Sequence, residues 1–386
     1  MQYFLSRIKG DKIIWLIVII LSVFSLLAVY SSTGTLAYKY QGGNTEYYMI
    51  KHFIILMFGL FLMYLAHLVK YTYFSRIFQI ALWVAIPLLL LTLFVGLNLN
   101  EARRVLPLPF GLSFQTSDLA KLTLIMYLAR MLTKRQDNIK DFKSAFLPII
   151  IPVLIICFLI LPANFSTAAI LFTTSLVLMF IGRVSLKHIF SMIGIGVVTM
   201  VIMILIAKSV PDLLPRVDTW ITRIESFKEG DSEVNYQVEQ SKIAIANGGL
   251  LGVMPGNSEQ RNFLPHPYSD FIFAIIIEEY GLIGGIVVVL LYLILLFRAV
   301  KIVTKCPQNF GAFLTIGVAF SLVFQAMINM AVAVNLLPVT GQTLPFISMG
   351  GTSIWFTSIS IGIILSVSKE IENNPENVQA LQATAA

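Results

Sequence analysis

Long apolar runs, separated by short polar and basic segments, recur along almost the whole chain. A run of about 20 apolar residues is enough to cross the hydrocarbon core of a bilayer as a helix. Ten runs qualify when they are read against the positions of charges, prolines and glycines. They cover residues 12–32, 52–69, 77–97, 115–133, 144–161, 165–182, 187–207, 271–298, 310–334 and 350–368. The pattern predicts an all-α polytopic membrane protein with about ten transmembrane helices.

The composition excludes a soluble enzyme. Hydrophobic residues make up 57% of the 386 residues and charged residues 12%, whereas soluble domains carry about 25% charged residues. At a mean hydropathy of +0.84, there is too little polar surface to cover a water-facing globule. The net charge of +7 is not arranged as a basic stripe with interleaved aromatic residues, so we expect no nucleic-acid partner.

Cysteine and histidine indicate no resident metal. Cys157 lies in an apolar run and Cys306 in a short basic loop, so neither a disulfide framework nor a thiolate site is predicted. The four histidines are scattered without metal-ligand spacing.

The loops on the two sides of the predicted helices differ in charge. One set of loops, with the N-terminal segment, holds fifteen Lys and Arg residues, and the other short loops hold four. The basic set is the N-terminal segment, 70–76, 130–143, 183–187 and 298–305. Because cytoplasmic loops are rich in Lys and Arg, we expect both termini to be cytoplasmic.

This orientation defines the organisation of the chain. The first run, 13–30, follows basic residues as a signal peptide does, but it is long for one and no small-residue cleavage site is evident, so we expect an uncleaved span. Residues 1–368 then form one membrane domain. Within it, the large segment 208–270 between the seventh and eighth helices lies outside the cytoplasmic membrane. Residues 369–386 form a polar cytoplasmic tail.

The fourth predicted helix is the least apolar. Asp118 and Lys121 are three residues apart, so they share a helix face and can pair. Polar groups inside a membrane usually face a protein interior or a cavity. The pair is therefore either a structural ion pair or a functional charge relay. Arg103 and Arg104 precede this helix, and reaching toward the membrane interface explains them from the sequence alone.

The outer segment contains a predicted helix and a glycine-rich loop. Residues 236–246 place Val238, Ile243 and Ile245 among polar residues, a pattern that fits a short amphipathic helix at the membrane surface, and 247–249 is a helix-end signal. The loop that follows holds Gly256 and Ser258. Glycine-rich loops can bring backbone N–H groups close to a phosphate, although glycine also serves ordinary turns.

Asp270 stands where this segment meets the eighth predicted helix. It is either a helix N-cap or a general base whose pKa is set by partial desolvation and neighbouring cations. Glu278 and Glu279 follow about two turns further in, where acidic pairs are costly unless they are paired or face water. They indicate a polar cavity beneath Asp270, or a cation or proton path.

Four ordered blocks of residues resemble the SEDS family (shape, elongation, division and sporulation) over nearly the whole chain. The glycine and proline patterns at 256–258 and 338–341 are more similar to its cell-division branch than to its rod-elongation branch. The blocks are ARR (102–104) with FQTSDLAK (114–121); residues 236–249; residues 256–281; and LLPVTG (336–341) with residues 344–353.

This resemblance implies a peptidoglycan glycosyltransferase that polymerises lipid II outside the cytoplasmic membrane, at the division septum. It also implies a class B penicillin-binding transpeptidase and other divisome proteins as partners. Asp270 falls on the family's essential aspartate and would be the general base that activates the acceptor hydroxyl. The resemblance makes Arg104 and Lys121 the candidate cations for the undecaprenyl pyrophosphate leaving group.

Further residues have secondary roles in this interpretation. Arg103, Gly256 and Ser258 are additional candidates for contact with the pyrophosphate. Asp118, Gln237, Glu278 and Glu279 are assigned to a supporting polar network. Before Asp270 the chain has HPYS (266–269), where the family commonly has EAHT, so no role of those side chains is carried over.

One carboxylate with cations is chemically sufficient, because a pyrophosphate leaves as a stable anion and needs no second acid. No cofactor is evident. A divalent cation, Mg²⁺ or Mn²⁺, that bridges the pyrophosphate is plausible chemistry, but no dedicated ligand cluster is present in the sequence.

Two alternative functions stay open. A lipid II flippase or transporter would use polar groups within the spans as a translocation path, although the candidate residues cluster at the outer side rather than at the midplane. A non-catalytic divisome scaffold would use helix faces or the tail 369–386 for docking.

Overall fold

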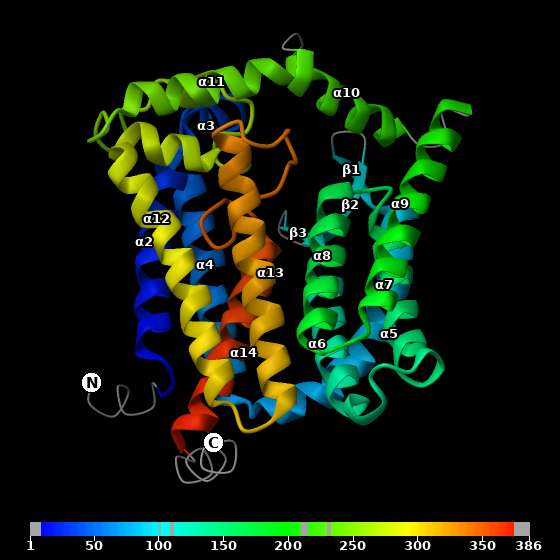
Figure 1. Ribbon diagram of the computed structural model, residues 1–386. Coiled ribbons are helices and arrows are strands. Elements are labelled where there is room, and N and C mark those ends of the chain that lie inside the picture. The colour runs from blue at the N-terminus through cyan, green and yellow to red at the C-terminus, as the bar shows by residue number, and fades with distance from the viewer. Residues whose placement is uncertain (1–8, 100–101, 109–111, 210–214, 230–232, 374–386) are drawn as a thin grey trace.

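The computed structural model describes residues 9–99, 102–108, 112–209, 215–229 and 233–373. Most of this part of the chain is helical, and its longer helices stand together as a bundle (Figure 1). Each range that the sequence predicts to be a helix overlaps one of them. These helices are α2 (Lys12–Ser32), α4 (Thr45–Leu68), α5 (Tyr71–Val95), α6 (Thr116–Lys134), α7 (Leu147–Ile160) with the π-turn Phe142–Phe146 before it, α8 (Phe165–Ile181), α9 (Leu186–Ser209), α12 (Ile272–Lys305), α13 (Asn309–Ala333) and α14 (Thr352–Asn373).

Seven helices in the described part of the chain are long and apolar enough to cross a membrane. An eighth is added if the two parts of α5, Tyr71–Ile77 and Gln79–Val95, which are bent by 47°, form one span. α8 has only 17 residues, and α6 is too polar to qualify. The polytopic all-α class is therefore confirmed, whereas the count of ten spans stays a prediction.

Burial explains why α6 can be polar and α9 cannot. Thirteen of the nineteen α6 residues are buried, and the helix packs against α5, α7, α8 and α13. In α9, only 17% of the apolar window is buried inside the protein. A helix that faces lipid must be apolar, whereas one surrounded by protein can hold polar groups that pair with each other.

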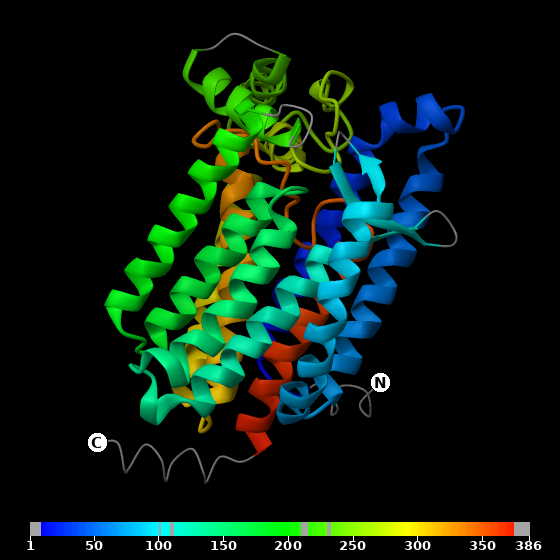
Figure 2. The ribbon, with the colours of Figure 1, turned by 90° about the vertical axis from the view of Figure 1, so that its right-hand side faces the viewer.

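Shorter elements gather at the end of the bundle opposite the described chain ends (Figures 1 and 2). The sheet is antiparallel in the order β1-β2-β3. The sequence predicts α11 at 236–246, and the structure extends it by a few residues at either end; α10 and the sheet were not predicted. The elements are α3 (Gly34–Tyr40), β1 (Leu97–Leu99), β2 (Ala102–Leu108), β3 (Leu112–Gln115), α10 (Pro215–Glu229), α11 (Glu233–Gly248) and the 3₁₀ turn η5 (Gln260–Asn262).

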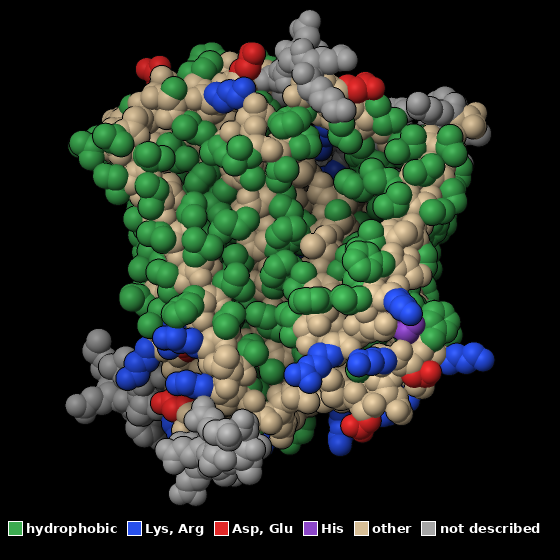
Figure 3. Space-filling model, in the orientation of Figure 1, with side chains coloured by type: hydrophobic (Ala, Val, Ile, Leu, Met, Phe, Trp, Pro, Cys, Tyr) green, Lys and Arg blue, Asp and Glu red, His purple; other side chains and the backbone are tan. Residues whose placement is uncertain are grey.

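Lys and Arg side chains gather at the opposite end, where α2 begins and α14 ends (Figure 3). Asp11 accepts a hydrogen bond from the backbone N–H of Ile13 at 3.0 Å and pairs with Arg298 at 2.5 Å. Lys70 pairs with Glu370 at 3.2 Å. The basic loops that the sequence assigns to the cytoplasm thus lie at one end of the bundle, and the orientation itself stays a prediction.

The loop after α11 is built into a break in α12. Gly281 has φ 72° and ψ −177°, which interrupts the helix. The freed carbonyls of Glu278 and Glu279 accept hydrogen bonds from Val253 and Met254 at 2.9 and 3.1 Å. The outer segment is thereby fixed to α12 a short way beyond Asp270.

Candidate active site

Asp270 does not cap the helix that follows it. α12 begins at Ile272, with Phe271 at the cap position and no side-chain cap hydrogen bond. Instead, the Ser269 hydroxyl donates to Asp270 Oδ1 at 2.8 Å. The Asn329 side-chain amide donates to the Asp270 backbone carbonyl at 2.9 Å, which fixes the main chain. The helix-cap interpretation is therefore wrong, and the general-base interpretation stays a prediction.

The surroundings of Asp270 alter its acidity. The residue is half-buried, and the loss of hydration raises the pKa of its carboxyl above the ordinary value. The hydrogen bond from Ser269 and the charges of His266 and Arg223 oppose this rise. A carboxyl with a raised pKa binds a proton more readily, which is what a general base working near neutral pH requires.

Arg223, on α10, is a residue that the sequence interpretation missed. Its Nη1 donates to the Val339 carbonyl at 3.1 Å. A Cβ placed on Gly341 would stand 3.6 Å from Asp270 Oδ2 and 4.0 Å from Arg223 Nη1. Within the described residues the two charged groups do not form an ion pair. Both groups therefore lie within 4 Å of the same point at Gly341, beyond ion-pair distance of each other.

The segment 338–350 connects this point to the interior of the bundle. Ser348 Oγ donates to the Ser269 carbonyl at 2.6 Å. Asn329 Nδ2, which holds the aspartate's carbonyl, also donates to the Gln342 carbonyl at 2.7 Å. The aspartate and this segment are thus held by shared hydrogen bonds.

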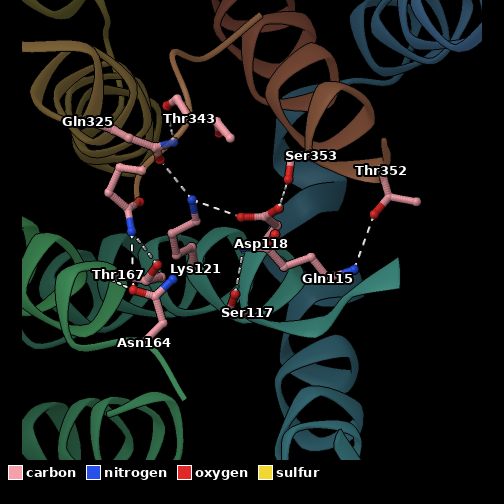
Figure 4. A network of polar contacts seen from close by, with 11 residues as sticks. Gln115, Ser117, Asp118, Lys121, Asn164, Thr167, Gln325, Thr343, Thr352 and Ser353 are labelled. Atoms are coloured by element: carbon pink, nitrogen blue, oxygen red, sulfur yellow. Dashed lines mark hydrogen bonds and ion pairs between the residues drawn. The ribbon is translucent and has the colours of Figure 1, made fainter. Parts of the chain in front are cut away.

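Asp118 and Lys121 form the ion pair that their spacing predicts (Figure 4). The Lys121 Nζ lies 2.9 Å from Asp118 Oδ1 and donates to Gln325 Oε1 at 3.0 Å. Ser353 Oγ donates to the other carboxylate oxygen at 2.5 Å. The Gln325 amide then donates to the Thr343 carbonyl at 3.1 Å, which links the pair to segment 338–350. The two side chains are 15% and 6% exposed, so the charge of Lys121 is balanced mainly inside the protein.

The pair lines a polar cavity of about 40 Å³. This is room for water rather than for a sugar, because a water molecule occupies about 30 Å³ of liquid. The lining comes from α6, α13, α14 and the segment before α14, and does not include Asp270, Glu278 or Glu279. It is therefore a different cavity from the one expected beneath Asp270, which stays a prediction.

Arg104 is placed apart from the ion pair. It lies on β2, and its Nε donates to the Ala163 carbonyl at 3.0 Å, in the turn before α8. It borders a separate cleft with Gln115 and Asn164. Arg104 therefore holds β2 against the bundle in addition to any contact with lipid or substrate. Arg103 is also in β2, but its side chain lies outside the part that the structure describes.

Glu278 and Glu279 anchor the glycine-rich loop. Glu278 accepts hydrogen bonds from the Ser258 hydroxyl and, at 3.2 Å, from the Glu259 backbone N–H. Glu279 accepts from the Ser31 hydroxyl on α2. Ser258 is therefore brought to Glu278, and no hydrogen bond in the described chain joins it to Asp270. This arrangement holds α2, the loop and α12 together.

Gly256 and Gln237 are the two remaining predicted residues. Gly256 has φ +83°, so it turns the loop in a conformation that favours glycine, and open space surrounds the position of a Cβ. Gln237 is half-buried on α11. No hydrogen bond among the described residues joins either of them to the aspartate.

No group of three or more His, Cys, Asp or Glu residues in the described ranges is arranged to hold a metal ion. A divalent cation on a pyrophosphate takes many of its ligands from phosphate oxygens and water. The expectation of such a cation therefore stays a prediction.

Taken together, the bundle and its outer end define a polytopic membrane protein with one partly buried carboxylate beside a cation. The family described as "Cell cycle protein", which groups FtsW, RodA and SpoVE, matches residues 11–373. The chain belongs to this family, which confirms the resemblance predicted from the four blocks.

Curated relatives cover almost the whole chain. A protein of Coxiella burnetii named probable peptidoglycan glycosyltransferase FtsW is 34% identical over 379 residues, which cover 95% of this chain and 99% of the relative. Stage V sporulation protein E of Bacillus subtilis is 30% identical over 369 residues, 94% of this chain and 98% of the relative.

Solved structures share the fold. One, described as a peptidoglycan synthase complex that coordinates polymerization and crosslinking, has a TM-score of 0.70 at 24% identity and covers 94% of this chain and 98% of its own. The rod shape determining protein RodA of Thermus thermophilus has a TM-score of 0.67 at 22% identity, with 94% and 97% covered.

Proposed function

We propose that the protein is a peptidoglycan glycosyltransferase that joins lipid II units into glycan strands at the outer face of the cytoplasmic membrane during cell division. The names of the FtsW relatives support the reaction class and the division role. The observation that carries the proposal is Asp270, a half-buried carboxylate with a raised pKa that caps no helix and faces Arg223 at the outer end.

In the proposed step, Asp270 takes the proton from the 4-hydroxyl of the acceptor sugar. The hydroxyl oxygen forms a bond to the anomeric carbon of the donor. The bond between that carbon and the pyrophosphate oxygen breaks, and its electron pair leaves with undecaprenyl pyrophosphate. The charge that develops on the leaving group is best stabilised by fixed cations and backbone donors.

The remaining predicted site residues differ in how free they are to meet substrate. Lys121 shares its charge with Asp118, and Arg104 has one donor on Ala163. Ser258 is engaged by Glu278. These residues, with Arg103 and Gly256, stay candidates for lining the lipid II site. None of them is proposed as the main cation that contacts the pyrophosphate.

The proposal includes a class B penicillin-binding transpeptidase and other divisome proteins as partners, in the inner membrane at the septum. The fold shared with the peptidoglycan synthase complex supports a transpeptidase partner. Cross-linking would then follow polymerisation in the same assembly.

The test is glycan-strand formation from purified lipid II by the protein with its cognate transpeptidase. Wild type is compared with Asp270→Asn, which keeps the side-chain size and removes the basic carboxylate. Lys242→Gln, an exposed change on α11, is the matched control. Polymer from wild type and the control, but not from Asp270→Asn, is expected; equal polymer from Asp270→Asn would remove the general base from the mechanism.

A flippase is the second candidate, and the cavity lined by Asp118 and Lys121 inside the bundle favours it. Its volume of about 40 Å³ is far too small for a disaccharide headgroup, so transport would need a large opening of the bundle. A scaffold role alone does not explain why a carboxylate is kept partly desolvated beside an arginine. Normal division by an Asp270→Asn protein that still assembles with its partner would favour the scaffold.

A further inference from the structure

Arg223 reaches the site from a helix anchored elsewhere. Trp220 of α10 packs against Phe165 of α8, with ring centroids 5.0 Å apart. Val217 is buried with Met203 and Ala207 of α9. The far end of the Arg223 side chain is then fixed by the Val339 carbonyl. α10 is therefore held against α8 and α9, and the guanidinium of its Arg223 is held at a defined place by segment 338–350.

The charge at that place is only partly compensated. The guanidinium is half-buried, and burial lowers the pKa of Arg223 while the nearby Asp270 raises it. The Val339 carbonyl uses one of the five donors that an arginine has. Because the Asp270 carboxylate lies beyond ion-pair distance, it does not neutralise the Arg223 guanidinium. The guanidinium can therefore still bind an anion.

We infer that Arg223 binds the pyrophosphate of the lipid-linked donor, while Asp270, which lies near the same point at Gly341, takes the acceptor's proton. This inference rests on the proposed function and names the cation that acts in it. A planar guanidinium matches phosphate oxygens with two parallel hydrogen bonds, which a lysine cannot do. Because residue 341 is a glycine, no Cβ fills the position that lies 3.6 Å from Asp270 Oδ2 and 4.0 Å from Arg223 Nη1.

The other cations fit this task less well. Lys121 is already paired with a buried carboxylate and a glutamine, and Arg104 lies at a separate cleft. Arg223 alone among these three is placed within 4.0 Å of the point that Asp270 also faces. Its contact with substrate would therefore be made beside the proposed base.

The test measures binding separately from turnover. Undecaprenyl pyrophosphate and undecaprenyl phosphate are the probes, titrated by microscale thermophoresis into the purified complex with its transpeptidase. Arg223→Gln should weaken binding of the pyrophosphate by about tenfold or more, since it removes a charge-assisted bidentate contact. Arg223→Lys should bind the pyrophosphate with an affinity between those of wild type and Arg223→Gln. The affinity for undecaprenyl phosphate should fall less than the affinity for the pyrophosphate. Lys242→Gln should bind both probes as wild type does.

Asp270→Asn separates the inference from the function on which it rests. It should abolish polymer while binding the pyrophosphate at least as tightly as wild type, because a negative charge is removed. If wild type makes no polymer yet binds the probe through Arg223, the proposed function fails and the inference stands.

Unchanged pyrophosphate affinity in Arg223→Gln would overturn the inference. This holds even if its activity falls or the acid limb of its pH profile moves to higher pH, since Arg223 would then only keep Asp270 ionised. Thermal unfolding of each variant excludes a loss of binding that comes from loss of fold.

Discussion

Gly341→Ala is a sharp test of the space beside Asp270 and Arg223. Residue 341 has φ +64°, where an L side chain costs about 1–2 kcal/mol. The new methyl would stand 3.6 Å from Asp270 Oδ2 and 4.0 Å from Arg223 Nη1, which are ordinary van der Waals distances, so the folded protein can accommodate it. We therefore expect Tm to fall by only a few degrees.

The effect on polymerisation should be much larger than the effect on stability. A methyl group in this space would displace the reacting atoms by an ångström or more, and such a misplacement can cost about 100-fold in rate. The assay is the initial rate of glycan-strand formation from lipid II, at equal amounts of folded complex. Binding of the pyrophosphate should change much less than the rate.

Gly42→Ala is the matched control. Gly42 has φ +58° and open space around its Cβ position, in the turn between α3 and α4. It should show the same backbone strain without the loss of rate. Gly341→Ala that polymerises at the wild-type rate would refute the idea that the reacting atoms meet at this point.

Other expected outcomes concern stability and pH. Asp118→Ala should lower the free energy of unfolding by about 3 kcal/mol, because it leaves the Lys121 cation buried without its partner. Adding Lys121→Met should restore most of that stability, as measured by chemical unfolding. A double variant no more stable than Asp118→Ala would contradict a buried ion pair between the two residues. Because folding raises the pKa of Asp270, its desolvated carboxylate destabilises the fold at neutral pH, so Asp270→Asn should unfold at a higher temperature there, with the difference vanishing below about pH 4. The polymerisation rate should fall on the acid side at a pH above the ordinary aspartate range, because burial raises the pKa of Asp270, and an acid limb at the ordinary aspartate value would contradict the desolvation. Gly252→Ala would place a Cβ 2.2 Å from the Glu279 carbonyl, so it should greatly reduce the yield of folded protein, and normal thermal unfolding would contradict the close packing of the α11 loop on α12.

Apolar periodicity predicts the bundle because a lipid-facing helix has no alternative to an apolar surface. It works best for helices such as α9, which is mostly exposed, and least for α6, whose polar residues face other helices. The i,i+3 spacing of Asp118 and Lys121 was enough to predict their pairing, since it depends only on helix geometry. The partners from α13 and α14, Gln325 and Ser353, come from far along the chain and carry no local signal.

The site was predicted only in part for the same reason. Asp270 was identifiable from its motif, but its helix-cap alternative could be excluded only by the cap geometry of α12. Arg223 is one of six Lys and Arg residues in the segment 208–270, and nothing in the local sequence distinguishes it. Its position beside Asp270 results from how α10 lies across the bundle and from the bond to Val339. Similarly, Glu278 and Glu279 accept hydrogen bonds from the loop that packs into the helix break at Gly281. The periodicity of apolar residues does not predict these contacts.

The most direct test of the central claim follows two signals in one preparation. Proteoliposomes that contain the protein and its transpeptidase are supplied with lipid II, and glycan-chain length and transbilayer movement of lipid II are measured together. Wild type should make long strands, and Asp270→Asn should make none while lipid movement is the same in both. Strands from Asp270→Asn, or loss of lipid movement in that variant alone, would contradict a glycosyltransferase that uses Asp270 as its base.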